Sequence, residues 1–220
     1  MAEEELLDVL DEQMKVVGTA SRERVHAEGW LHQTFHCWVV THGEHGEWSI
    51  VFQLRHPDKD TYPCKLDTSC AGHLLAGETP ADGIRELEEE LGLRVAPNEL
   101  IYCGIARDET VVSATITDRE FNHVYLYPCD RKLGSFEVQT AEVSGLFLFN
   151  LTEIQALLHG EREGITAVES MVLESAPPGF EDPQKIWTLQ DFTPNNEPYY
   201  RLLFDTLRRL ERAEGEGAEK

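Results

Sequence analysis

The stretch GHLLAGETPADGIRELEEELGL (residues 72–93) sets four glutamates against one arginine between Ile84 and Leu93. Like charges one helical turn apart repel each other, and a helix that needed only solubility would interleave lysines. Capping residues at positions 79–82 and a glycine at position 92 predict that residues 80–92 form this helix. Its crowded carboxylates therefore need a partner of opposite charge.

The placement of the carboxylates on the predicted helix favours a metal ion as that partner. Placed at ~100° per residue, Glu86, Glu89 and Glu90 cluster roughly 140° from the apolar stripe. That stripe consists of Ile84, Leu87 and Leu91. Mg²⁺ prefers a few carboxylates together with water and phosphate oxygens, and Mn²⁺ is the alternative ion. The competing interpretation is an acidic helix face that is only solvated.

The spacing of the whole stretch resembles the Nudix box: a glycine, five residues, a glutamate, a spacer and then R-E-U-x-E-E-x-G-U, where U is aliphatic. The matching residues are Gly72, Glu78, Arg85, Glu86, Leu87, Glu89, Glu90, Gly92 and Leu93. The resemblance implies the Nudix fold, an α/β (α+β) domain with a mixed β-sheet sandwiched between α-helices. It also implies metal-assisted hydrolysis of a small-molecule diphosphate linked to another group, X.

The resemblance also assigns roles to the catalytic residues. Glu86, Glu89 and Glu90 would bind the metal, and Arg85 would hold these carboxylates by ion pairs and hydrogen bonds. One departure affects Glu78, which usually orients the arginine: the spacer TPADGI between Glu78 and Arg85 has six residues instead of seven. The shortening is expected in the loop ahead of the helix, because the spacing from Arg85 onward is intact.

Composition sets limits on partners and location. The 220 residues are 41% hydrophobic and 27% charged, which suits one globular domain. The formal charge of −22 argues against nucleic acid and against an anionic membrane as partners. The five cysteines are scattered and form no CxxC pair, as in a reducing cytosol. With no signal-like or membrane-spanning apolar segment, we expect a cytoplasmic protein.

A pass along the chain predicts strands mixed with fewer helices. An N-terminal β-hairpin is expected at residues 5–18, and further strands at 34–42, 48–55, 100–106, 110–117 and 123–129. Besides the acidic helix, helices are expected at 150–160 and 197–213, followed by a frayed tail at 214–220. We predict a Nudix domain over residues 1–165, including the hairpin. Residues 166–220 would form a C-terminal helical extension packed on the same domain.

A second resemblance covers roughly residues 5–150. The segments ELLDVLDEQMKVVGTASRERVH, LHQTFHCWVV and LDTSCAGH are similar to isopentenyl-diphosphate isomerases and to Nudix hydrolases related to them. The resemblance implies a second metal site with three imidazoles and two carboxylates, suited to zinc, manganese or magnesium. Its residues would be His26, His32, His73, Asp118 and Glu120. The alternative for each histidine is a surface or hydrogen-bonded core residue.

The position of the isomerase's catalytic cysteine separates the candidate functions. That cysteine directly precedes the glycine–histidine pair, and Ala71 stands there in this sequence. Cys70 lies one residue earlier, and on a strand its side chain would point to the opposite face as a buried thiol. We therefore favour a Mg²⁺-dependent hydrolase of a nucleoside diphosphate derivative or related diphosphate. The alternatives are an isomerase and a catalytically silent Nudix binding module.

Several further features leave more than one interpretation open. Glu137 and Glu142 are candidate bases outside the box. The C-terminal aromatic residues could form a lid, a homodimer contact or, as we favour, a helix packed on the sheet. These aromatic residues are Phe180, Trp187, Phe192, Tyr199 and Tyr200.

Overall fold

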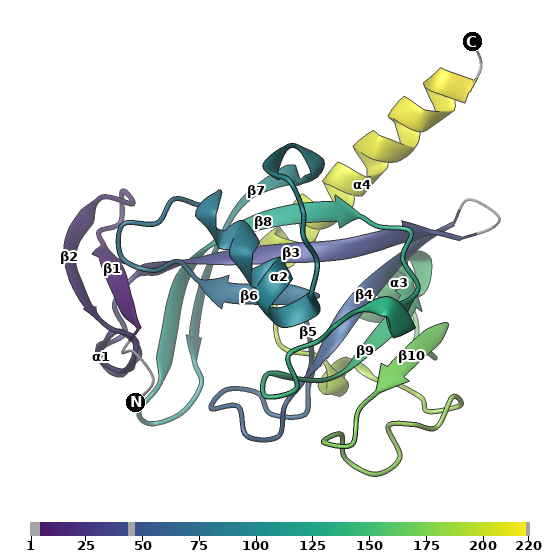
Figure 1. Cartoon of the computed structure of the whole chain (residues 1–220), viewed down its shortest axis with the longest axis horizontal. Coiled ribbons are helices and arrows are strands. Elements are labelled where there is room, and N and C mark those ends of the chain that lie inside the picture. The colour runs from purple at the N-terminus through teal and green to yellow at the C-terminus, as the bar shows by residue number, and fades with distance from the viewer. Residues whose placement is uncertain (1–4, 44–46, 219–220) are drawn as a thin grey trace.

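The structure, a computed structural model, describes residues 5–43 and 47–218 (Figure 1). The strands are β1 (Leu6–Leu10), β2 (Val16–Ser21), β3 (His32–His42), β4 (Trp48–Arg55), β5 (Leu66–Asp67), β6 (Cys70–His73), β7 (Ile101–Val111), β8 (Thr117–Pro128), β9 (Val143–Asn150) and β10 (Glu169–Val172). The α-helices are α1 (Arg22–Glu28), α2 (Arg85–Leu91), α3 (Leu151–Leu158) and α4 (Glu197–Ala218). Four 3₁₀ turns are η1 (Asp82–Ile84), η2 (Pro97–Glu99), η3 (Leu133–Ser135) and η4 (Leu189–Asp191).

The main sheet has eight strands and is mixed. Six of them follow the order β10-β9-β4-β3-β8-β7, while β5 pairs with β4 and β6 pairs with β3. Strands β3 and β8 run parallel, and the other pairs are antiparallel. The β1–β2 hairpin forms a separate two-stranded sheet. The predicted Nudix fold, a mixed β-sheet with helices in an α+β domain, is confirmed.

Alternation along β3 directs side chains into two cores on opposite faces of the sheet. Phe35 and Cys37 pack with Leu87 of α2 in one core. Trp38 packs with Tyr199 of α4 in the other. Helix α2 therefore covers one face and α4 the other, as Figure 1 shows. Tyr199 of α4 is only 1% exposed in this second core.

Strand β3 changes its partner along its length, and this change positions the site. Residues 34–37 pair with β6, whereas residues 40–42 pair with β4. The sheet therefore forks between β6 and β4, on the side covered by α2. A side chain from α2 can reach the backbone of one branch and the side chains of the other.

Most predicted elements are present, with three corrections. The expected strand at 110–117 is wrong, because residues 112–116 form the turn of the β7–β8 hairpin, where the Val112 amide donates to the Ile116 carbonyl at 3.0 Å. The β-branched composition of this stretch concealed the turn. The acidic helix starts later than position 80, because its first turn is the 3₁₀ turn η1. The tail expected to fray at 214–220 is helical to Ala218, and residues 219–220 lie outside the described part.

The elements that were not anticipated from the sequence include α1, β5, β9 and β10. Helix α1 is short and polar, and Val25 is its buried residue. Strand β9 is a continuous buried run without the alternation of a half-exposed strand, because it lies inside the sheet between β4 and β10. Among the described residues, no helix is long and apolar enough to cross a membrane.

Candidate active site

Arg85 is the hub of the loop and helix formed by residues 72–93. Its Nε donates to Glu78 Oε1 at 2.9 Å, and its Nη1 donates to Glu86 Oε1 at 2.6 Å and to Glu89 Oε2 at 3.1 Å. Its Nη2 donates to the backbone carbonyl of His73 at 3.1 Å. The hydrogen bond and charge of Arg85 hold the pKa of Glu78 below its usual value. The six-residue spacer thus preserves the contact between Glu78 and the helix arginine.

Glu86 and Glu90 lie one helical turn apart and are both buried, at 9% and 6% exposure. Burial raises the pKa of Glu86 to about 7. Burial, followed by the charge of Glu86, raises the pKa of Glu90 to about 8. The Glu89 side chain is 54% exposed. Helix α2 therefore buries two carboxylates at the fork of the sheet in addition to Leu87 and Leu91, which pack on the core.

The backbone around the two carboxylates is shaped to receive them. A Cβ on Gly72 would lie 2.2 Å from the carboxyl carbon of Glu86, so only glycine lets β6 approach so closely. Glu90 Oε2 accepts from Gln53 Nε2 of β4 at 3.3 Å and from the Ala71 amide of β6 at 3.4 Å. Gly92 ends α2 with a left-handed φ of 65°. Glu90 thus bridges the two branches of the fork through neutral donors.

This donor set fits a hard divalent cation. Two adjacent buried carboxylates with raised pKa values are stabilised when a cation is bound between them, and Mg²⁺ prefers such oxygen ligands. Lys59 lies close enough for its charge to lower the pKa of Glu90, but it forms its own ion pair with Glu142. The lysine therefore brings positive charge to the edge of the site without neutralising the pair. No feature of the sequence predicted the placement of Lys59.

The two candidate bases outside the box lie in different places. Glu142 pairs with Lys59 at the edge of the carboxylate site. The backbone of Glu137 packs against Gly92, where a Cβ on the glycine would meet Glu137 Cβ at 2.7 Å. Glu137 thus lies at the carboxyl end of α2, whereas Glu142 is linked to the site through the lysine.

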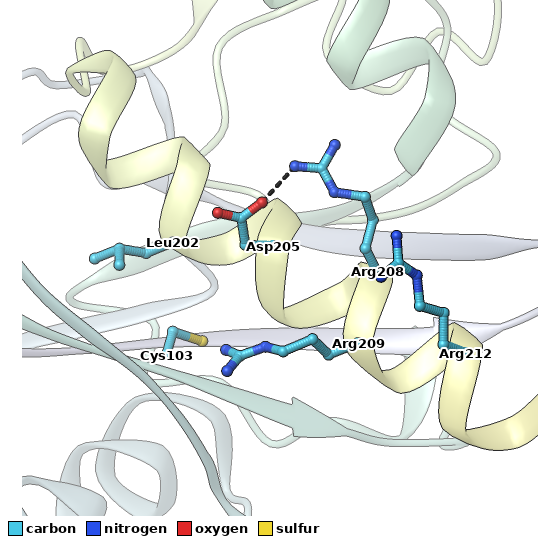
Figure 2. A pocket seen from close by; sticks show the side chains of 6 residues that line it. All are labelled: Cys103, Leu202, Asp205, Arg208, Arg209 and Arg212. Atoms are coloured by element: carbon cyan, nitrogen blue, oxygen red, sulfur yellow. Dashed lines mark hydrogen bonds and ion pairs between the residues drawn. The ribbon is translucent and has the colours of Figure 1, made fainter.

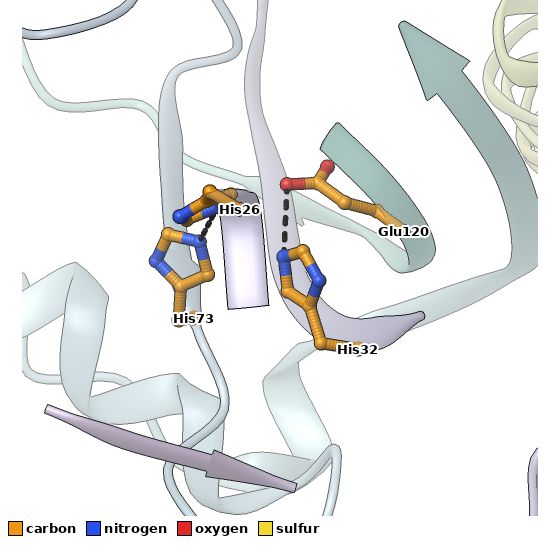
Figure 3. Close-up of side chains that lie close together, drawn as sticks. All are labelled: His26, His32, His73 and Glu120. Carbon is orange, nitrogen blue, oxygen red and sulfur yellow. Dashed lines mark hydrogen bonds and ion pairs between the residues drawn. The ribbon is translucent and has the colours of Figure 1, made fainter. Parts of the chain in front are cut away.

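Four of the five residues predicted for the second site converge. Ligand atoms of His26, His32, His73 and Glu120 all lie within 4.8 Å of one another (Figure 3). They come from α1, β3, β6 and β8. His73 Nε2 lies 3.3 Å from His26 Nε2, and His32 Nε2 lies 3.4 Å from Glu120 Oε1. The fifth, Asp118, places Oδ1 3.5 Å from His26 Nε2.

The electrostatics of this imidazole–carboxylate cluster also fit a metal. Burial lowers the pKa of His26 to about 4 and that of His73 well below its usual value, so both rings are neutral at pH 7. Burial, followed by the charge of Glu120, raises the pKa of Asp118 to about 6. Among the described residues, Asp118 Oδ1 and His32 Nε2 are buried without a hydrogen bond, and for His32 the charge of Glu120 outweighs burial and raises the pKa. Imidazole nitrogens and carboxylate oxygens are the ligands that zinc or manganese uses.

The geometry agrees with the relatives of the chain. The NUDIX domain profile matches residues 30–168. The chain belongs to the Nudix hydrolase family. Members of this family are generally pyrophosphohydrolases. The chain is 40% identical to an uncharacterized Nudix hydrolase of Clostridium acetobutylicum over 205 residues, which are 93% of this chain and 98% of that protein.

Two further comparisons concern a more distant sequence relative and a solved structure. The chain is 33% identical to the isopentenyl-diphosphate delta-isomerase of Streptomyces griseus over 128 residues, 57% of this chain and 62% of that enzyme. The crystal structure of a Deinococcus radiodurans protein superposes with a TM-score of 0.53 at 22% identity, covering 71% of this chain and 90% of that chain. The second comparison supports the fold.

Within this Nudix domain, the thiol near the glycine–histidine pair faces away from the imidazoles. Cys70 is fully buried in the core under α2, and burial raises the pKa of its thiol well above the usual value. The prediction of a buried Cys70 is confirmed. Ala71 pairs in register with His36 and points to the opposite face. The isomerase-like position therefore carries a methyl group.

Two hollows lie away from the Nudix carboxylates. One, of ≈ 390 Å³ between β7 and α4, is lined by Cys103, Leu202, Asp205, Arg208, Arg209 and Arg212 (Figure 2). In Figure 2 Asp205 pairs with Arg208, while the Arg209 side chain extends toward Cys103. The other, of ≈ 510 Å³, lies between α3, η4 and α4. Neither hollow is lined by a residue that the sequence predicted for catalysis or metal binding.

Proposed function

We propose that this protein is a Mg²⁺-dependent hydrolase that cleaves a diphosphate linkage in a nucleoside diphosphate derivative or a related diphosphate. The observation that carries the proposal is the burial of Glu86 and Glu90 side by side, with pKa values raised to about 7 and about 8 and only neutral hydrogen-bond donors on Glu90. A helix that was merely acidic would expose both. The paired arrangement is best explained by a bound cation.

The roles of the residues follow from this placement. Glu86, Glu89 and Glu90 would hold Mg²⁺, which when bound neutralises phosphate oxygens and lowers the pKa of a water molecule. Arg85 fixes Glu86 and Glu89 and is itself anchored by Glu78, so the carboxylates are held in place before substrate arrives. Water adds to one phosphorus, the bond to the bridging oxygen breaks, and two phosphate products leave.

Lys59 and Glu142 form the edge of the proposed site. The Lys59 ammonium would neutralise charge on the second phosphate, because its field already reaches both Glu90 and His73. Of the two carboxylates outside the box, Glu142 is the better candidate to accept the proton of the attacking water, since it lies against Lys59. We further propose that His26, His32, His73, Asp118 and Glu120 bind a second metal ion.

The isomerase alternative remains testable on the same protein. It is disfavoured because Ala71 has no ionisable group and the Cys70 thiol lies on the α2 side of the sheet, beside Glu90 and away from the imidazoles. The silent binding module is disfavoured because all three Nudix glutamates are present and Arg85 binds two of them, Glu86 and Glu89.

Phosphorus NMR with Mg²⁺ tests the proposal. The pooled panel would hold nucleoside di- and triphosphates, nucleotide sugars, dinucleotide cofactors, coenzyme A and isopentenyl diphosphate, with the Glu89→Gln variant run in parallel. New monophosphate signals that disappear in the variant would establish the hydrolase. A panel left intact would favour the binding module, and formation of dimethylallyl diphosphate would establish the isomerase.

A further inference from the structure

The sheet face opposite α2 carries a second set of polar side chains in strand register. Asp108 of β7 lies opposite Glu120 of β8, which lies opposite His32 of β3. Two residues along, Asn122 of β8 lies opposite Thr34 of β3. Residues opposite each other on adjacent strands point to the same face. The polar rows therefore extend from the imidazole–carboxylate cluster across three strands.

The next row along β3 contains an imidazole that no proposed metal site uses. His36 Nδ1 lies 2.9 Å from the hydroxyl of Tyr199, which belongs to α4 and is 1% exposed. The same hydroxyl lies 3.0 Å from Thr68 Oγ1. Ala71 is opposite His36 in register, and the apolar core begins with Trp38, two residues further along. The polar region thus ends where α4 closes over the sheet.

These groups retain hydrogen-bonding capacity of both kinds. Asn122 accepts from Thr34 Oγ1 at 2.8 Å, and within the described residues its Nδ2 donates to no protein group. Within the same part of the chain, His36 Nε2 has no hydrogen-bond partner either. Asp108 adds a half-buried carboxylate, whose oxygens accept from Asn196 at 3.1 Å and from Thr110 at 3.0 Å. One amide donor, one imidazole nitrogen and a carboxylate thus lie on the same face of the sheet.

The loop between β4 and β5 contains a tyrosine in an unusual backbone conformation. Tyr62 lies in the loop between β4 and β5, with a left-handed φ of 47° that is unfavourable for a tyrosine. Burial, followed by the charges of Asp118 and Asp108, raises the pKa of its phenol. Arg55 holds the loop through Thr61, with its Nε donating to the carbonyl at 2.9 Å.

We propose that this face binds the X group of the substrate and that X is a hydroxyl-bearing group, a pentose or hexose ring, and not a hydrocarbon. The inference rests on the proposed function and names the substrate class for that site. A hydroxyl both donates and accepts, which complements the mixture of Asn122, His36 and Asp108. A hydrocarbon would remove water from these groups and offer no replacement bonds, and sites built in this way reject analogues that lack the hydroxyl.

The position relative to the diphosphate site suits this assignment. Gly72 contacts the metal-site Glu86, and its neighbours Ala71 and His73 point to the polar face. From β6 to β7 the face spans three strand spacings of about 4.8 Å, or roughly 14 Å, which accommodates a ring sugar with a further substituent. A diphosphate at α2 and a sugar on the polar face would therefore be contiguous.

Calorimetric titration with uncleavable ligands tests the inference without relying on hydrolysis. Wild-type protein with Mg²⁺ would be titrated with the α,β-methylene analogue of ADP-ribose and with the methylene analogue of isopentenyl diphosphate. We expect the sugar-bearing ligand to bind at least tenfold more tightly. Equal binding, tighter binding of the hydrocarbon analogue, or no binding of either ligand would overturn the inference.

Variants locate the preference on the named residues. Asp108→Leu and His36→Phe should each reduce the preference at least tenfold, and Tyr199→Phe, which removes one hydroxyl, should reduce it less. Glu109→Gln is the matched control, since Glu109 neighbours Asp108 on β7 and points to the other face, where it pairs with Arg107. A preference that survives both Asp108→Leu and His36→Phe, with unfolding midpoints unchanged, would refute the assignment.

Failure of this inference and failure of the proposed function are distinguishable. A protein that cleaves diphosphates in the NMR assay but binds the two analogues equally is a hydrolase whose X group is recognised elsewhere. A protein that cleaves nothing yet prefers the sugar analogue retains the polar recognition face as a binding module.

Discussion

The two faces of β6 show two ways of burying side chains that can bind a metal. On the α2 side, Glu86 and Glu90 are carboxylates whose local excess of negative charge is only partly offset by Arg85. On the other side, His26 and His73 are kept neutral by burial, so their Nε2 atoms lie 3.3 Å apart with little net charge. The first arrangement suits a hard cation that shares phosphate oxygens, and the second suits zinc or manganese. Adjacent residues of β6 would thus border two proposed metal sites of different kinds.

The largest effect is expected from Glu90→Gln. The change removes a carboxylate worth several kcal/mol of charge stabilisation when metal and phosphate are bound, so hydrolysis should fall on the order of 100-fold or more. Because burial raises the pKa of Glu90 to about 8, the neutral amide should fold as well as the wild type without Mg²⁺. Phosphorus NMR and thermal unfolding measure the two quantities. A variant that keeps its activity would contradict the role of Glu90.

The substitution His32→Gln should abolish binding of the second metal at the imidazole–carboxylate cluster and leave Mg²⁺ binding at α2 unchanged. We expect affinity for zinc or manganese to fall at least ~10-fold, as for removal of groups that support a metal site. Metal content after dialysis, measured by mass spectrometry, tests this. His159→Gln, at an exposed position, is the control. Equal metal content in wild type and His32→Gln would remove the cluster from consideration as a metal site.

Gly72→Ala should disturb the sites on both faces of β6. The new Cβ would lie 2.2 Å from the Glu86 carboxyl carbon, and overpacking of this kind costs about 1–3 kcal/mol. The unfolding midpoint in urea should fall accordingly, together with activity. Gly134→Ala is matched to it, because a Cβ there meets nothing within 4 Å. If both substitutions behaved alike, close approach of β6 to α2 would not be the reason for the glycine.

The smallest effect is expected from Glu88→Gln on the same helix. Glu88 pairs with Arg94, whose side chain is 85% exposed, and surface pairs contribute about 0–1 kcal/mol. Stability and hydrolysis should both stay near wild-type values. A large loss of activity would show that the acidic helix acts through its total charge and not through its buried members.

The α2 site was predictable from the local spacing of its residues. Contacts between residues far apart in the sequence were not. Arg85, Glu86 and Glu89 lie within one helix, so helical periodicity brings them together. The histidine cluster depended on resemblance, because α1, β3 and β6 meet only in the folded sheet. The contact of His36 with Tyr199 joins positions 163 residues apart, and no local sequence pattern predicts it. The same holds for Lys59, whose partner Glu142 lies across the fold.

The most direct test of the central claim, that the buried carboxylates form a cation site, is urea unfolding at pH 5.5 and 8.5 with Mg²⁺ or EDTA. Folded-state pKa values of about 7 for Glu86 and about 8 for Glu90 exceed the unfolded value of 4.5, so the native state binds more protons and, in EDTA, these groups make stability decline as pH rises through this range. We predict that Mg²⁺ restores stability at pH 8.5 much more than at pH 5.5, and that Glu90→Gln reduces this difference. Equal effects of Mg²⁺ at both pH values, or an undiminished effect in the variant, would contradict the account.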